Sequence, residues 1–122
     1  GTGTALMTIN GDVYSTNGHA INFVSTSSAD EATITTGSSS HIESTNASGI
    51  AFFNSSAADD TNITIGGYVH GHGGYGVIGR KYGSGDLNIT TYAGSNVIGS
   101  GKALVGQDYG SGNIIIDVMA MC

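Results

Sequence analysis

Residues 82–91 read YGSGDLNITT, and residues 109–118 read YGSGNIIIDV. The two segments lie 27 residues apart, and each places a Gly-Ser-Gly turn shortly before a short apolar run. An offset of this size is typical of repeat proteins, in which each unit is one supersecondary element that stacks on its neighbours. We therefore interpret the rest of the chain as further copies of this unit.

Short apolar runs recur along the whole chain at a nearly constant spacing. Five of them begin near residues 5, 32, 61, 87 and 114, which are 27, 29, 26 and 27 residues apart. Two further sets follow within each unit, near Val13, Ile42, Val69 and Val97, and near Ile21, Ile50, Val77 and Leu104. Three short strands cannot bury an apolar face alone, but stacked units form three parallel sheets around an axis.

The sequence thus predicts an all-β fold, a parallel β-helix (β-solenoid) of about four coils of 26–29 residues with three short strands per coil. Residues 1–122 would form a single β-solenoid domain or an excised segment of a longer one. Alternation along each strand would direct the aliphatic residues inward and the threonines between them outward. In the third strand Phe23 would lie above Phe52. In the two later coils, Gly79 and Gly106 stand at the position of these phenylalanines. We therefore expect those coils to be narrower at this position.

The composition restricts the range of partners. The 122 residues include 21 Gly, no Pro and no Trp, and the net charge is −6 with three basic residues, Arg80, Lys81 and Lys102. Nucleic acid is not an expected partner, because binding to it depends on neutralising phosphates. No run approaches the ~20 apolar residues of a membrane-spanning helix. The single Cys122 cannot form an intrachain disulfide.

The two later coils resemble a known family. Residues 76–91 (GVIGRKYGSGDLNITT) and residues 103–118 (ALVGQDYGSGNIIIDV) are similar to the repeats of bacterial autotransporter passenger domains. The match is specific mainly over residues 77–118, and the earlier coils share only the strand pattern. The resemblance implies a right-handed parallel β-helix, secretion or exposure at the cell surface, and a structural or adhesive role toward a host or surface ligand.

The acidic residues at the turns align in one column: Glu31, Asp60 and Asp86, followed by Asn113, with Asp30 and Asp59 adjoining. Successive coils lie ~4.8 Å apart, so stacked carboxylates repel unless they are solvated or share a cation. Calcium suits such oxygen ligands, although the alternating aspartates of dedicated calcium repeats are missing. We favour solvated turns, and a bound Ca²⁺ is the alternative; no other cofactor is expected.

Four histidines invite a second metal hypothesis. Alternation would place His70 and His72 on one face of the same strand, as a two-ligand site requires. The spacing fixes no cysteine or carboxylate beside them. His19 and His41 fall at other positions of the repeat, so a four-histidine cluster is not expected, and solvated imidazoles are the favoured interpretation.

No convergent catalytic set is evident, and we expect a non-enzymatic protein. A carbohydrate-acting β-helix enzyme is the third alternative. Such enzymes need convergent carboxylates or a base on one face, and the sequence does not place them together. Here the acids lie at turns, and Lys81 aligns one coil before Asp108 as an ion pair. Possible glycosylation sites of the Asn-x-Ser/Thr type are Asn46, Asn54, Asn62 and Asn88.

The last apolar run raises a second function. Its residues would form an uncovered strand with the apolar side chains Ile114, Ile115, Ile116, Val118 and Met119. Open solenoid ends expose unpaired strands and core. Either the chain has been cut from a longer β-helix, or copies stack head to tail into a self-assembling extracellular filament.

Overall fold

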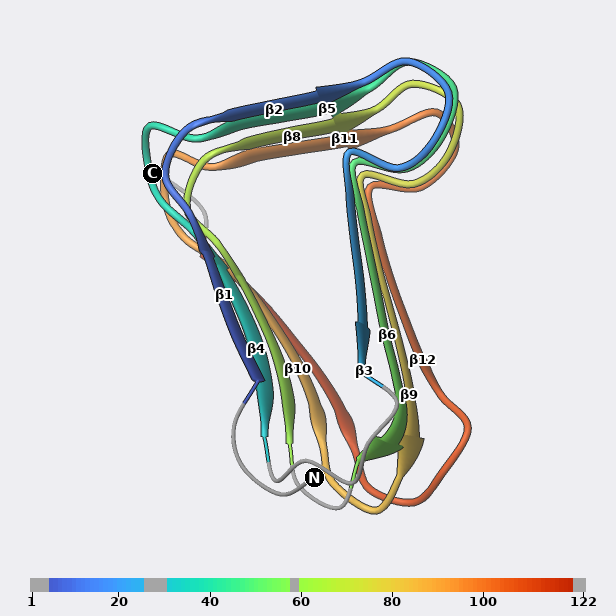
Figure 1. Ribbon diagram of the computed structural model, residues 1–122. Coiled ribbons are helices and arrows are strands. Elements are labelled where there is room, and N and C mark those ends of the chain that lie inside the picture. Colours follow the sequence, from blue (N-terminus) through green and yellow to red (C-terminus); the bar gives the residue numbers. More distant parts are fainter. Residues whose placement is uncertain (1–4, 26–30, 58–59, 120–122) are drawn as a thin grey trace.

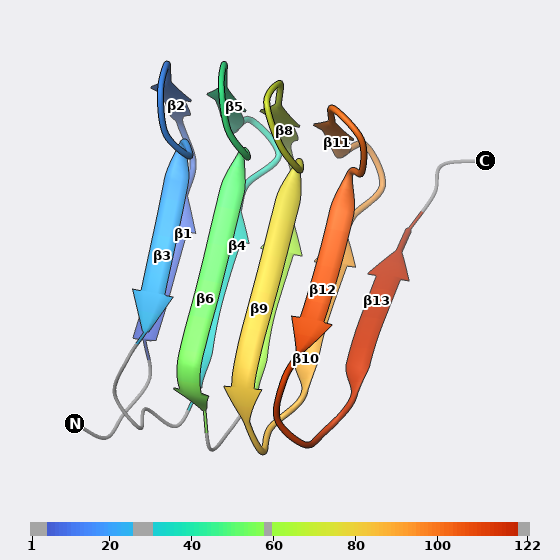
Figure 2. The ribbon, with the colours of Figure 1, turned by 90° about the vertical axis from the view of Figure 1, so that its right-hand side faces the viewer.

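The computed structural model describes residues 5–25, 31–57 and 60–119, which form thirteen β-strands and no helix. Seen along the axis, each coil is three-sided (Figure 1). Seen from the side, the coils follow one another as a regular stack (Figure 2). All strand pairs are parallel, and the chain is an all-β solenoid of about four turns, as the repeat predicts. In the part that the structure describes, no helix is long and apolar enough to cross a membrane.

Each side of the coil belongs to one sheet. Sheet A holds the first strand of every coil in the order β1 (Ala5–Ile9), β4 (Ala32–Thr36), β7 (Thr61–Ile65), β10 (Leu87–Thr91) and β13 (Ile114–Val118). Sheet B contains β2 (Asp12–Ser15), β5 (His41–Ser44), β8 (Tyr68–Gly71) and β11 (Asn96–Gly99). Sheet C contains β3 (Ile21–Ser25), β6 (Ile50–Ala57), β9 (Val77–Gly83) and β12 (Leu104–Asp108).

The sequence alignment of the coils matches the strand register. In sheet A, Ile34 pairs with Ile63, and Ile63 pairs with Ile89. The other sheets follow the same rule, with Ile42 beside Val69 and further aliphatic pairs in sheet C. β-branched residues suit these strands because their side chains pack well on a pleated surface. The predicted spacing of 26–29 residues is therefore the length of one coil.

Stacks of buried aliphatic side chains fill the interior. The buried core contains Ile21, Ala32, Ile34, Ile42, Ile50, Phe52, Ile63, Ile65, Val69, Val77, Leu87 and Ile89. Each fully buried aliphatic or aromatic side chain contributes about 1.5–3 kcal/mol. The threonines of β4, β7 and β10 that face outward remain half-exposed, as alternation predicts.

A side chain of sheet A lies against sheet C where glycine replaces phenylalanine. Phe23 and Phe52 stack with their ring centroids 4.6 Å apart. In the next coil Gly79 pairs with Phe52, and a Cβ atom there would lie 2.8 Å from Cδ1 of Ile63 in the opposite sheet. The isoleucine thus occupies the space next to Gly79 that a side chain there would need, and the narrowing of these coils stays a prediction.

The Gly-Ser-Gly turns stack backbone on backbone. A Cβ atom on Gly110 would lie 1.9 Å from the main-chain oxygen of Gly83 one coil earlier, so no side chain fits. Gly112 has a φ of 103°, a left-handed conformation that glycine adopts readily. The rings of Tyr82 and Tyr109 stack beside these turns at 5.0 Å. Glycine at these positions is required by the close approach of the backbones and by the left-handed turn.

Truncating the central stack tests the assignment of faces. We expect Ile63→Ala to lower the free energy of unfolding by about 2–5 kcal/mol, because it leaves a cavity between two coils. Thr64→Ala, on the outward face of the same strand, should cost less than about 1 kcal/mol. Urea denaturation followed by circular dichroism measures both. Equal losses in the two variants would contradict the assignment.

Candidate functional site

Aromatic and histidine rings gather on the outer face of sheet B. Tyr14, His41 and Tyr68 lie side by side on three successive coils, with ring centroids 5.3 Å and 4.3 Å apart. His70 follows on the same face, 5.9 Å from the ring of Tyr68, and stacks on His72 at 3.6 Å. Because outward residues alternate with core residues along each strand, these rings share one solvent-facing surface.

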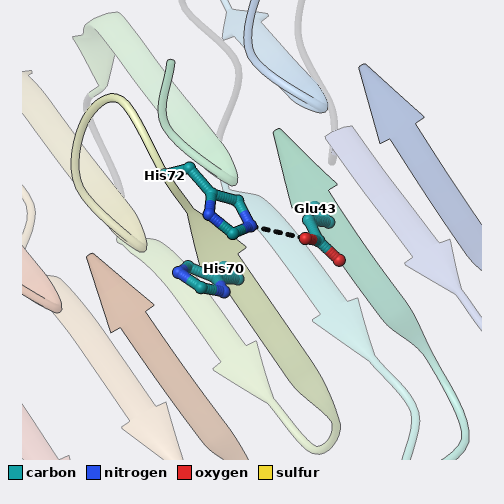
Figure 3. Close-up of side chains that lie close together, drawn as sticks. All are labelled: Glu43, His70 and His72. Atoms are coloured by element: carbon teal, nitrogen blue, oxygen red, sulfur yellow. Dashed lines mark hydrogen bonds and ion pairs between the residues drawn. The ribbon is translucent and has the colours of Figure 1, made fainter. Parts of the chain in front are cut away.

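Glu43 lies among these rings and is hydrogen-bonded to two of them. His41 donates from Nε2 to Oε1 at 2.8 Å. His72 donates from Nε2 to Oε2 at 2.5 Å, the bond drawn as a dashed line in Figure 3. The strand register places Glu43 directly beside His70 on the next coil. One possible ligand atom from each of Glu43, His70 and His72 lies within 4.8 Å of the others. We call these three residues the Glu-His cluster.

The structure adds two residues to the pair of histidines that the sequence singled out. The spacing along the strand fixes no carboxylate beside His70 and His72, but the structure places Glu43 there, one coil earlier on the same face. His41 also belongs to this surface, since it contacts Glu43. His19 lies elsewhere, as expected, and its Nδ1 accepts a hydrogen bond from a corner amide. The coil alignment already paired residue 43 with residue 70, so the missing signal was a comparison across coils.

The surroundings shift three pKa values on this face. Hydrogen bonds from His41 and then His72 lower the pKa of Glu43 below its usual 4.5. Burial and then the neighbouring His72 lower the pKa of His70 below its usual 6.5. Burial and then the charge of Glu43 raise the pKa of Tyr68 above its usual 10.0. At neutral pH the face therefore presents an ionised carboxylate, a neutral imidazole at His70 and a protonated tyrosine.

A groove of about 290 Å³ lies between the outer face of sheet C and the corner that follows sheet B. At the corner, His19, Ser48 and Tyr75 occupy equivalent positions, joined by a 3.2 Å bond from Ser48 N to His19 Nδ1 and a 3.0 Å bond from Tyr75 N to Ser48 Oγ. The sheet supplies Asn22, Ala51, Phe52, Phe53, Ile78 and Arg80. Aromatic, amide and guanidinium groups together suit a polar ligand that also has an apolar face.

The turn acids form a ladder of hydrogen bonds between coils. Oδ1 of Asp60 accepts a bond from the main-chain N–H of Asp86 at 2.9 Å, and Oδ1 of Asp86 accepts one from the N–H of Asn113 at 2.9 Å. Glu31 takes part through its main-chain oxygen, which accepts from an amide of β1. Asp30 and Asp59 lie outside the described residues. The carboxylates of this column do not form a group of possible metal ligands among the described residues. The group that does is the Glu-His cluster.

The four asparagines of the sequons differ in exposure. Asn46 is exposed at the corner after β5, and its amide donates to a main-chain oxygen of the preceding coil. Asn54 is buried, and its amide donates to Oγ1 of Thr61 at 3.1 Å. Asn62 and Asn88 are half-exposed on sheet A and are joined by a 2.9 Å hydrogen bond. Asn46 is therefore the sequon whose side chain is most accessible in the folded chain.

A lysine lies inside the solenoid. The side chain of Lys81 is 0% exposed, and Nζ lies 3.3 Å from Oδ1 of Asp108, which is 7% exposed. Nζ also donates to the main-chain oxygens of Gly83 and Ser111, both at 3.0 Å. The expected ion pair between coils is confirmed. Because both groups lie in the interior corner of sheet C, they hold neighbouring coils together and do not face a substrate.

The last strand leaves an apolar surface uncovered. β13 pairs with β10 on one side, and the described residues provide no strand on the other. Its exposed large apolar side chains are Ile114, Ile115, Ile116 and Val118, together with Met119 after the strand. At the opposite end of the stack, Leu6 of β1 is 67% exposed. Within the described residues, β1 pairs with β4 alone and β13 with β10 alone, so each has one strand edge that no described strand covers.

The comparisons with known proteins add no family to this description. Neither protein-family models nor curated protein sequences nor solved structures gave a match to this chain. The class of protein that the fold itself defines is the parallel β-solenoid.

The buried ion pair can be tested by a double-mutant cycle. We expect Lys81→Met to lower the free energy of unfolding by about 3–5 kcal/mol, because it leaves the Asp108 carboxylate buried without its cation. Asp108→Asn in the same chain should recover a large part of the loss, since the charge is then removed while Oδ1 is kept. Urea denaturation at pH 7 gives the coupling. Losses that simply add would show that the two groups do not interact.

Proposed function

We propose that the chain is a non-enzymatic β-solenoid segment with a structural or adhesive role, secreted or exposed at the cell surface. The observation that carries the proposal is the uninterrupted stacking of 26–29-residue coils into three parallel sheets. Such a stack is a stiff rod with long, repetitive outer faces, which suits a stalk or a binding surface. The resemblance of residues 77–118 to autotransporter passenger repeats supports the location.

The use of the polar residues favours a role without catalysis. Asp60 and Asp86 accept main-chain hydrogen bonds between coils, and Lys81 is paired with Asp108 in the interior. Groups committed in this way stabilise the stack and are not available to a substrate. The carbohydrate-acting enzyme is therefore the weaker alternative, since it requires convergent carboxylates on one face.

The groove beside sheet C is the best location for an adhesive ligand. Phe53 and Tyr75 provide rings, Asn22 an amide, and Arg80 a guanidinium group held by a 2.8 Å hydrogen bond from Nε to Gln107. Sugar rings combine apolar faces with hydroxyl groups, so a glycan or glycoprotein of another cell fits these groups better than an apolar molecule does. The proposed partner is thus a polar ligand on a host or other surface.

A bead assay tests the adhesive role. Beads that carry the purified chain should bind cultured epithelial cells at least several-fold more than beads that carry albumin. Tyr75→Ala should reduce this binding, because it removes a ring from the groove, whereas Tyr92→Ala, at another corner, should not. Circular dichroism checks that both variants fold. Binding no higher than that of albumin would contradict the adhesive role.

The uncovered strand edges favour a second candidate function. We propose as an alternative that copies of this chain stack head to tail, with β13 of one copy beside β1 of the next. Parallel strands at the two ends give a heterologous contact that repeats without closing, which builds a filament. The apolar side chains of β13, such as Ile114 and Ile116, would then cover the interior of the next copy. This contact continues the register of sheet A across the junction.

Electron microscopy separates the two functions. Under the filament hypothesis, negatively stained preparations of the chain show long filaments of uniform width. Ile116→Lys should abolish them by placing a charge in the junction, while the side chain in the single chain is 45% exposed and tolerates it. Thr90→Lys, on the outer face of β10, is the matched control and should leave filaments intact. Monomers or amorphous clumps in the unmodified chain would contradict self-assembly.

A further inference from the structure

We propose that the Glu-His cluster binds one zinc-type divalent transition-metal ion between two coils. The ligands would be a carboxylate oxygen of Glu43 and one imidazole nitrogen from each of His70 and His72. Two imidazoles and one carboxylate form a donor set typical of zinc, with the remaining position left to water. The site joins β5 to β8 and is independent of both the groove and the strand edges.

The backbone already brings the three ligands together. Glu43 and His70 are register partners on paired strands, and His72 follows directly after β8. Their ligand atoms lie within 4.8 Å of one another, whereas ligands around a tetrahedral zinc ion lie about 3.3 Å apart, given bonds of about 2.0–2.2 Å. Side-chain rotations that move the ligand atoms by about 1–2 Å close this difference, so the ion can bind without a shift of the strands.

Two neighbouring side chains hold the ligands in place. His41 donates to Oε1 of Glu43 at 2.8 Å and leaves Oε2 directed at His72. The hydroxyl of Tyr68 lies 2.8 Å from Nδ1 of His70, which fixes the orientation of that ring. Hydrogen bonds of this kind orient metal ligands in known sites. A metal ion would replace the proton through which His72 now bonds to Glu43.

The donor set selects the class of metal. Imidazole nitrogen suits zinc, copper and nickel, while calcium and magnesium prefer sites made of oxygen ligands. The net charge of −6 favours any cation near the surface, so charge alone does not select zinc. Titrations with Zn²⁺ and with Ca²⁺ therefore distinguish a built site from general attraction.

Isothermal titration calorimetry with zinc chloride tests the proposal on the intact chain. We expect one Zn²⁺ per chain, a melting temperature that rises with zinc because the ion binds the folded state, and no comparable effect of Ca²⁺. His72→Ala and Glu43→Gln should each weaken zinc binding at least tenfold. Both side chains lie on the outer face, and circular dichroism confirms that the variants remain folded.

His19→Ala is the matched control, because it removes a histidine that lies outside the cluster. Its zinc affinity should equal that of the unmodified chain. The proposal is overturned if zinc does not bind or if Ca²⁺ binds equally well. It is also overturned if His19→Ala loses as much zinc affinity as His72→Ala and Glu43→Gln do. Adhesion and filament formation are measured without zinc, so their outcomes do not depend on this site.

Discussion

The parallel hydrogen bonding of each coil to the next is the constraint on which every other feature depends. It places each side chain directly beside its counterpart one coil earlier, as in the series Ile34, Ile63 and Ile89. Like residues therefore contact like residues, and an insertion within a strand would move core residues to the surface. The coil length varies at the corners and also within β6, where the pairing with β9 shifts register between Asn54 and Ala57, beyond the core residues of that strand.

The same constraint explains why so much of the fold can be predicted from the sequence. The recurrence of short apolar runs predicts the coil length, and alternation within a run predicts which face is buried. Phe52 and Gly79 can be assigned to one position in successive coils in the same way. The position of Lys81 follows too: it lies two residues after Gly79 on an inward-facing row. Its complete burial was still not predicted, because lysine is rarely buried unless it is paired.

The Glu-His cluster was missed for a physical reason. A search along one strand finds residues such as His70 and His72, which are close in sequence, but in a solenoid the nearest neighbour of a side chain is about 27 residues away. Glu43 meets the histidines only across the gap between coils. The turn acids show the converse: Asp60 and Asp86 align as a column, yet their oxygens accept backbone hydrogen bonds that residue type alone does not reveal.

The chemistry that the chain can offer is confined to its outward rows, because inward rows are fixed by packing. On β4, β7 and β10 of sheet A these rows hold threonine and asparagine, and Asn62 and Asn88 are hydrogen-bonded to each other. On sheet B the rows change from coil to coil, from Tyr14 to Glu43 to His70. A purely structural face requires no such change, since polar residues of any kind keep a strand solvated. The concentration of ionisable rings on one face therefore marks sheet B as the surface where this solenoid departs from repetition.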